Sequence, residues 1–268
     1  LDSSTVRLIL PFDGILRNGF RYLSNLPSHL YHFRRTFISD ISSTIMEKTA
    51  KAKKPSTAKK DQGEQIRESY IEYILTHGHE PPSIFQFAKE LKLKEEDIYG
   101  YYNSFSSIEK DIWHQYFNTT VAMLEAEPVY AEYSIREKLL AFYFTMFEVL
   151  QKNRSYVLVT LKHLKKGDMN PNFLKVFKLD FEHYIKELVQ EGIETDEVVS
   201  RPYVTERYHK GFWIQMMFLM NFWLNDETQG FEKTDAAIEK AVNLSLDLIA
   251  KGPLDSMLDF AKFFAQNR

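Results

Sequence analysis

Apolar residues recur along most of this chain at intervals of three and four, and alternating apolar–polar runs are few. This spacing is typical of amphipathic helices. It predicts a first helix over residues 64–76, which Gly78 follows as a stop. Ser83 and Gln86 form a Ser-x-x-Gln capping box directly after two prolines, so a short second helix is predicted to begin there. The pattern therefore predicts a nearly all-α fold.

The next stretch predicts a tight turn and another short helix. Residues 92–94 form a connector between two apolar patterns. The acidic residues 95–97 suit the positive end of a helix that carries Ile98 and Tyr99. A third helix start follows close behind, so the stretch has the organisation of a helix-turn-helix.

Apolar, aromatic and serine residues follow one another here in a definite order: Phe87-Ala88, Leu93, Ile98-Tyr99, Tyr102, Ser104 and Ile108. In this order they resemble the DNA-binding domain of tetracycline-repressor-type (TetR) regulators. In that family an Ile-Ala pair packs the first motif helix, a hydrophobic-Tyr-x-x-Phe run forms the recognition helix, and a serine opens the next helix. Lys92 stands where the family has a turn glycine. The resemblance covers about residues 64–116 and implies a transcription regulator with a variable, all-helical second domain.

Double-stranded DNA is the partner that this resemblance implies. Cations and hydroxyls hold phosphates, and a carboxylate can accept a hydrogen bond from a cytosine amino group. The expected DNA-binding residues are Lys92, Lys94, Glu95, Tyr99 and Tyr101, with Lys59 and Lys60 in the preceding tail. An alternative stays open, because residues 46–100 hold ten basic and ten acidic residues. It is a helical ligand- or protein-binding module of the same fold with weak or lost DNA binding.

The N-terminal segments differ in composition from the rest of the chain. Residues 1–45 contain five arginines and no lysine, and Met46 opens a plausible natural start. We interpret 1–45 as a doubtful extension, upstream or cloning-derived, with a transit peptide or a marginal helical extension as alternatives. Residues 46–63 are expected to be a basic, disordered tail, since 47–60 hold six lysines and one acid. The helix-turn-helix domain is then predicted over 64–112.

Residues 113–268 predict a helical regulatory and dimerisation domain. Ser106 and Glu109 form a capping box at the start of its long first helix. A later helix begins near Asn172, and Gly192 is expected to end it.

Two further helices of this domain predict how it assembles. Residues 203–225 are apolar nearly all round, so this helix is either central or meets another subunit. Small residues on the helix 234–251 would let another helix come close. Together they predict a homodimer in which four helices meet across a two-fold axis.

The aromatic residues of this domain have two interpretations. The resemblance to TetR-type regulators implies that they line a cavity for a small apolar effector. The competing interpretation is an ordinary core, since aromatic stripes at helical spacing are usually core. The residues expected at such a pocket are Tyr143, Phe147, Phe177, Phe181, Trp213 and Met217.

The remaining chemistry indicates no enzyme. The chain has no cysteine, a formal net charge of −3 and no common catalytic signature, so we expect no catalytic residue and no cofactor. The pairs Glu206-x-x-His209 and Asp180-x-x-His183 are interpreted as solvated helix ends rather than metal ligands. The apolar helix at 203–225 is too short and too flanked by charge to span a bilayer. A cytoplasmic protein is therefore expected.

Overall fold

The computed structural model describes residues 62–162, 168–202 and 204–250, together with Gly252, Phe260, Phe263, Phe264 and Gln266. All of them fall within the compact unit Lys59–Arg268. The expected extension at 1–45 and the lysine tail with Lys59 and Lys60 lie outside the described residues. The apolar pattern of residues 254–264 predicts a short last helix, and most of these residues lie outside the described ones as well.

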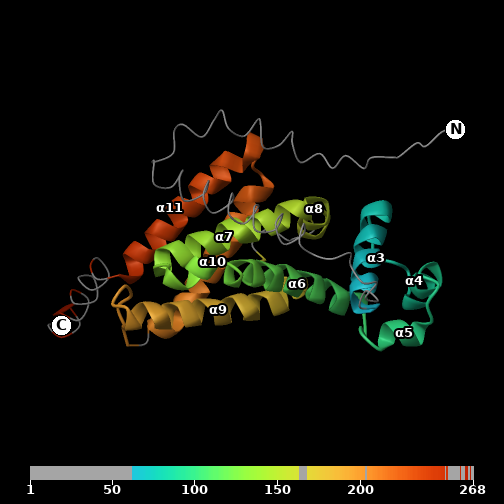
Figure 1. Cartoon of the computed structure of the whole chain (residues 1–268), viewed down its shortest axis with the longest axis horizontal. Coiled ribbons are helices and arrows are strands. Elements are labelled where there is room, and N and C mark those ends of the chain that lie inside the picture. Colours follow the sequence, from blue (N-terminus) through green and yellow to red (C-terminus); the bar gives the residue numbers. More distant parts are fainter. Residues whose placement is uncertain are drawn as a thin grey trace. The chain divides into compact units, whose positions relative to one another are not determined.

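Every regular element among the described residues is a helix, which confirms the predicted all-α fold (Figure 1). The α-helices are α3 (Gln62–His77), α4 (Ile84–Glu90), α5 (Glu95–Tyr99), α6 (Phe105–Glu125), α7 (Ile135–Lys152), α8 (Arg154–Lys162), α9 (Lys175–Glu194), α10 (Tyr208–Leu224) and α11 (Glu232–Ile249). Short 3-10 turns lie between them: η3 (Pro128–Glu132), η4 (Asn172–Leu174), η5 (Thr205–Arg207) and η6 (Gln229–Phe231).

The helix-turn-helix is built by α3, α4, α5 and the start of α6 around a small aromatic core. The predicted cap at Ser83 is confirmed, because its hydroxyl accepts a hydrogen bond from the backbone N–H of Gln86 at 3.2 Å. The ring of Tyr70 stacks on Phe105 at 5.6 Å and meets the edge of Phe87 at 6.0 Å. These contacts join α3, α4 and α6 into one core.

The long helix α6 begins at Ser104, the serine that the resemblance places at this helix start, so the capping box predicted at Ser106 is wrong. Its N-cap is Ser104, not Ser106, because Ser104 has extended backbone and exchanges side-chain hydrogen bonds with Ser107 at 3.2 Å. With this start Phe105 is already helical and its ring reaches the aromatic core. Glu109 accepts a hydrogen bond from the Tyr70 hydroxyl at 3.2 Å instead of closing a capping box.

The second helical region is a bundle through which α6 continues without a break, so the predicted domain boundary at 112/113 falls inside one helix. Helix α6 packs on α7 and α9, and α10 lies between α9 and α11 (Figure 1). Helix α11 also packs on α7, and α8 packs on α3 of the helix-turn-helix. The helix-turn-helix is therefore joined to the bundle by α6 and by the α3–α8 contact.

Gly192 does not end its helix, contrary to the prediction. It lies inside α9, which continues to Glu194. A Cβ atom at this position would come within 2.6 Å of a Val198 methyl group and 3.1 Å of Ile135. The glycine thus serves a close approach of neighbouring segments rather than a helix stop.

Candidate functional site

The turn between α4 and α5 closes in a geometry that favours glycine. Lys92 has a φ of 56°, in the left-handed region. Its N–H donates to the carbonyl of Lys89 at 3.2 Å, and the N–H of Leu93 donates to the carbonyl of Ala88 at 2.9 Å. This pair of bonds is the Schellman ending of a helix. A lysine therefore occupies the glycine-like turn position, and the geometry of the helix-turn-helix is retained.

The residues predicted to contact DNA lie in this turn and on or just after α5. Lys92 and Lys94 are exposed, and Glu95 is half-buried. The side chains of Tyr99 and Tyr101 are each 49% exposed. These cations and hydroxyls are accessible to a partner, and their contact with DNA stays a prediction.

The three acidic residues at the start of α5 have different surroundings. Asp97 accepts a hydrogen bond from the backbone N–H of Lys94 at 2.9 Å, so its carboxylate caps the helix. Glu96 is exposed, and Glu95 is half-buried. Residues 62–112 contain ten acidic and five basic residues, which gives a formal charge of −5. The described helix-turn-helix is therefore acidic even though one carboxylate serves its own backbone.

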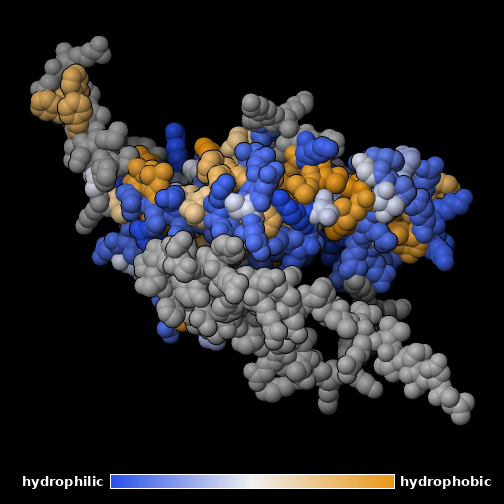
Figure 2. All heavy atoms as spheres, turned by 90° about the horizontal axis from the view of Figure 1, so that it is seen from above, coloured by the Kyte–Doolittle hydropathy of each residue, from blue (hydrophilic) through white to orange (hydrophobic). Residues whose placement is uncertain are grey.

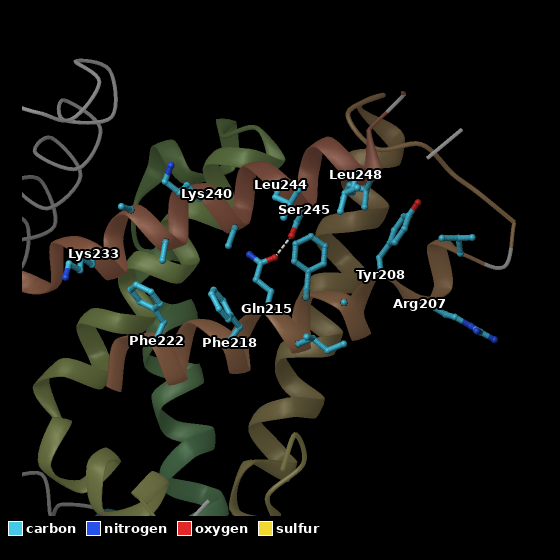
Figure 3. A pocket seen from close by; sticks show the side chains of 18 residues that line it. Arg207, Tyr208, Gln215, Phe218, Phe222, Lys233, Lys240, Leu244, Ser245 and Leu248 are labelled. Atoms are coloured by element: carbon cyan, nitrogen blue, oxygen red, sulfur yellow. Dashed lines mark hydrogen bonds between the residues drawn. The ribbon is translucent and has the colours of Figure 1, made fainter. Parts of the chain in front are cut away.

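Helices α10 and α11 border an apolar groove of about 950 Å³ (Figure 3). Four large side chains that line it are strongly exposed: Ile214 (60%), Phe218 (53%), Leu244 (61%) and Leu248 (41%). In Figure 3, Phe218 rises from α10 toward α11, which carries Leu244 and Leu248. Contiguous exposed apolar surface of this kind marks sites of protein–protein or membrane contact, or grooves that bind ligands.

Polar groups are few in this groove. The Ser245 hydroxyl donates to the side-chain oxygen of Gln215 and so links α11 to α10 (Figure 3). Lys233 and Lys240 lie along its rim. The face seen in Figure 2 carries hydrophobic patches intermixed with hydrophilic side chains. Sequence reasoning selected both helices of the groove, and the small residues expected to let another helix come close, Ala237 and Ala241, are among those that line it.

The residues expected at an effector cavity are all buried. Tyr143, Phe177 and Phe181 are fully buried, and Trp213, Phe147 and Met217 are at most 7% exposed. Phe177 stacks on Phe181 at 6.3 Å and meets Trp213 at 6.0 Å, whereas Phe147 contacts Trp223 at 5.8 Å. None of the six lines the α10–α11 groove. They lie in the core of the bundle, and the effector cavity stays a prediction.

A smaller hollow of about 300 Å³ lies among α6, α7, α9 and η3. The hydroxyls of Tyr130 and Tyr184 hydrogen-bond to each other across it at 2.5 Å. The ammonium of Lys138, itself buried, pairs with the carboxylate of Glu191. The principal polar groups of this hollow are thus already satisfied by one another.

The two acid-x-x-His pairs singled out in the sequence do not converge on one point. Asp180 pairs with His114 at 2.6 Å, and His183 pairs with Glu187 at 3.2 Å. His209 is buried, and burial lowers its pKa. Within 62–162, 168–202 and 204–250, no three histidine, aspartate or glutamate side chains gather as metal ligands. Nor does any helix in these ranges have the length and apolar character needed to cross a bilayer.

Residues 138–264 match the family model of the tetracyclin repressor-like C-terminal domain. This match confirms the resemblance carried by the helix-turn-helix residues, and it does so from a different part of the chain. Residues 138–264, slightly less than half of the chain, are therefore similar to the C-terminal domain of TetR-like regulators.

Two solved structures are similar to the chain. One is a protein with unknown function from Rhodococcus sp. RHA1, at 12% identity and a TM-score of 0.49, over 74% of this chain and 100% of that one. The other is a bacterial regulatory protein in the tetR family from Rhodococcus RHA1, at 14% identity and a TM-score of 0.46, over 72% of this chain and 100% of that one. No curated protein matches the sequence.

Proposed function

We propose that this protein regulates transcription by binding double-stranded DNA through α5 as a homodimer. The observation that carries the proposal is the retained turn between α4 and α5 in a chain with a TetR-like C-terminal domain. The exposed Lys94, Tyr99 and Tyr101 supply phosphate-binding and base-reading groups on this motif. Lys59 and Lys60 would add phosphate contacts from the preceding tail.

The second copy of the chain is the partner that would cover the α10–α11 groove. A two-fold interface places the same patch of each subunit face to face. Leu244 and Phe218 would then be buried against their counterparts, and burial of apolar side chains stabilises such contacts by about 25 cal/mol per Å². The exposure of these side chains supports this assembly.

An effector completes the proposal. A small apolar molecule would bind among Tyr143, Phe147, Phe177, Phe181, Trp213 and Met217 and change the affinity for DNA. The aromatic character of these residues supports this place, and because they are packed in the core of the bundle, an effector would have to displace some of their contacts. Binding would raise the melting temperature in proportion to the logarithm of ligand excess over the dissociation constant.

The test of DNA binding is a salt series with fluorescent duplexes from the region upstream of the protein's own gene. Three proteins are compared: the full chain, a version without residues 46–60, and Lys94→Ala. Lys94→Ala should weaken binding to all sequences alike and reduce the logarithmic salt slope by about one unit. An unrelated duplex serves as the control. Absence of binding at low salt would contradict the proposal.

A second candidate function is a ligand- or protein-binding module that keeps this fold without DNA affinity. The formal charge of −5 on residues 62–112 favours it, because carboxylates near phosphates repel them. Glu95→Gln separates the two candidates. If the carboxylate only repels DNA, the variant binds non-specific duplex more tightly; if it reads a base, sequence preference relaxes. No effect on any duplex would favour the module.

A further inference from the structure

The buried hydroxyl of Tyr102 ties three parts of the helix-turn-helix together. Tyr102 lies just after α5 and is 7% exposed. Its hydroxyl donates to Oδ2 of Asp111 on α6 at 2.5 Å and accepts a hydrogen bond from Nη1 of Arg67 on α3 at 2.9 Å. The same Nη1 of Arg67 donates to Asp111 Oδ2 at 2.7 Å. The three side chains therefore close a hydrogen-bonded triangle.

This triangle is charged and only partly open to solvent. The side chains of Arg67 and Asp111 are 18% and 24% exposed. Burial acts to raise the pKa of Asp111, but hydrogen bonds from Tyr102 and Gln115 and the Arg67 guanidinium outweigh it, so the pKa is lowered. Burial also raises the pKa of Tyr102 to about 12. At neutral pH the phenol therefore donates to an ionised carboxylate, which is a strong, charge-assisted hydrogen bond.

The hydroxyl of Tyr102 is not needed to fill the core. A phenylalanine ring would occupy nearly the same volume, and the TetR-type motif has phenylalanine here. Helix α5 has only five residues, so tertiary contacts decide where it lies. Its other anchor, Ile98, is fully buried, but apolar packing has no preferred direction. Hydrogen bonds have a preferred direction, so the hydrogen-bonded triangle can fix the angle of α5.

We propose that Tyr102, Asp111 and Arg67 are positioning residues for DNA recognition, holding α5 at one angle on α3 and α6. This inference rests on the proposed function, because it names what orients the recognition helix. Asp111 lies on α6, which continues to Glu125 in the bundle.

The test uses Tyr102→Phe in the full chain, which removes the hydroxyl and keeps the ring. Tyr73→Phe is the matched control, since Tyr73 lies on α3 in the same domain, is 8% exposed and is not part of the triangle. Circular dichroism first confirms that both variants fold. Hydrogen exchange without DNA then measures the amides of residues 100–102, which donate to carbonyls of Glu96 and Ile98. Affinities for specific and unrelated duplexes are measured over a salt series.

The expected result is faster exchange at residues 100–102 in Tyr102→Phe but not in Tyr73→Phe. Specific affinity should fall about tenfold, the size of one lost charge-assisted hydrogen bond. Non-specific affinity and the salt slope should stay unchanged, because the phosphate contacts remain. A lower ratio of specific to non-specific affinity is the readout that general destabilisation would not produce.

Three results would overturn the positioning role. The first is that Tyr102→Phe exchanges the amides of residues 100–102 no faster than wild type. The second is that exchange is faster but the affinity for the specific duplex stays within about twofold of wild type. The third is an equal loss of affinity for both duplexes, which would make the hydroxyl a phosphate contact. Wild-type protein that binds no duplex at low salt would instead overturn the proposed function. The exchange measurement would then still decide whether the triangle holds α5.

Discussion

The two domains joined by α6 differ in how they satisfy several buried tyrosine hydroxyls, although Tyr208 of the bundle accepts a hydrogen bond from Arg201 at 2.8 Å. In the helix-turn-helix, the hydroxyls of Tyr70 and Tyr102 each donate to a carboxylate, at 3.2 and 2.5 Å. In the bundle, the hydroxyls of Tyr116, Tyr143 and Tyr156 are buried without a hydrogen-bond partner among the described residues. A buried hydroxyl left unpaired costs about 1–3 kcal/mol. In the helix-turn-helix, the paired tyrosine hydroxyls therefore help to orient the helices. In the bundle, the three unpaired hydroxyls lower the stability of the fold.

The exposed surfaces of the two domains also differ in polarity. The helix-turn-helix exposes charges and tyrosine hydroxyls around α5, whereas the bundle exposes leucine and phenylalanine side chains along α10 and α11. A domain with a paired interior and a polar surface suits recognition at a fixed angle. A domain with unpaired buried hydroxyls and an apolar surface is stabilised further by whatever it binds. Substitutions that place a charge on the apolar surface, or that remove a paired or an unpaired hydroxyl, test this comparison directly.

The largest expected effect is on the apolar surface. Leu244→Glu places a carboxylate in the groove, at a side chain that is 61% exposed in the single chain. The fold should survive, but each subunit of a dimer would bury a carboxylate in its apolar interface. We expect the dimer dissociation constant to rise at least about a thousandfold, or about 4 kcal/mol. Light scattering over a concentration series measures this change.

Leu179→Glu is the control for this substitution. Leu179 lies on α9, is 59% exposed and does not line the groove, so the same change of charge at the same exposure should leave the dimer intact. If Leu179→Glu gave monomers and Leu244→Glu did not, the interface would lie on another face of the bundle.

The next effect concerns the paired interior of the helix-turn-helix. Asp111→Asn keeps the shape of the side chain but leaves Arg67 without an ionic partner, so unfolding stability at neutral pH should fall by about 2 kcal/mol. Because the folded-state pKa of Asp111 is lowered, its contribution is present above the usual carboxyl pKa of 3.8 and is lost as pH falls through the lower native pKa.

The difference between wild type and Asp111→Asn should therefore shrink on acidification. Thermal melts in buffers on both sides of the native pKa measure it, with Glu96→Gln as the control because Glu96 is exposed on the same domain. A difference that persisted in acid would mean that the ion pair does not stabilise the domain.

Local signals in the sequence were sufficient to predict most of the helices. The cap at Ser83 and the acidic first turn of α5 satisfy backbone groups within three residues, so they can be found without knowing the fold. The capping box predicted at Ser106 was wrong because Ser104 and Ser106 each have a residue three positions later that can complete a capping box, Ser107 and Glu109 respectively. The choice depends on Phe105 packing against Tyr70, a contact 35 positions apart that local pattern does not encode.

The candidate sites show the same limit. The accessible residues around α5 lie close together in the sequence, so the motif could be predicted from the residues. The triangle joins Arg67, Tyr102 and Asp111 across 35 and 44 positions, and nothing in the local pattern of Arg67 indicates it. The helix 203–225 left two interpretations open: α10 is central to the bundle, and the contact of its exposed face with another subunit stays a prediction. Helix α10 buries Trp213 and Met216 in the bundle while exposing Phe218.

Removal of a single hydroxyl should change stability with opposite sign in the two domains. Tyr143→Phe removes an unpaired buried hydroxyl, so the free energy of unfolding should rise by about 1–2 kcal/mol. Tyr102→Phe removes a paired one, so it should fall by about 1 kcal/mol. Urea unfolding at neutral pH measures both changes. A loss of stability in Tyr143→Phe would show that its hydroxyl has a partner in solution, and the comparison would fail there.

The smallest expected effect separates strain from charge at the turn. Lys92 holds a φ of 56° that costs a residue with a Cβ atom about 1 kcal/mol and costs glycine almost nothing. Lys92→Gly should therefore stabilise the protein by up to about 1 kcal/mol, whereas Lys92→Ala, which keeps the strain, should not. Both variants lose the same ammonium group and should weaken DNA binding equally, with the salt slope reduced by about one unit.

In thermal melts, the difference in stability between Lys92→Gly and Lys92→Ala measures the backbone strain. In the salt series, the loss of DNA affinity that both variants share relative to wild type measures the contribution of the charge. If glycine bound DNA less well than alanine, a flexible turn would let α5 move despite the Tyr102 triangle. If the two bound equally, the triangle would be sufficient to set the angle of α5, and the left-handed lysine would be present for its charge.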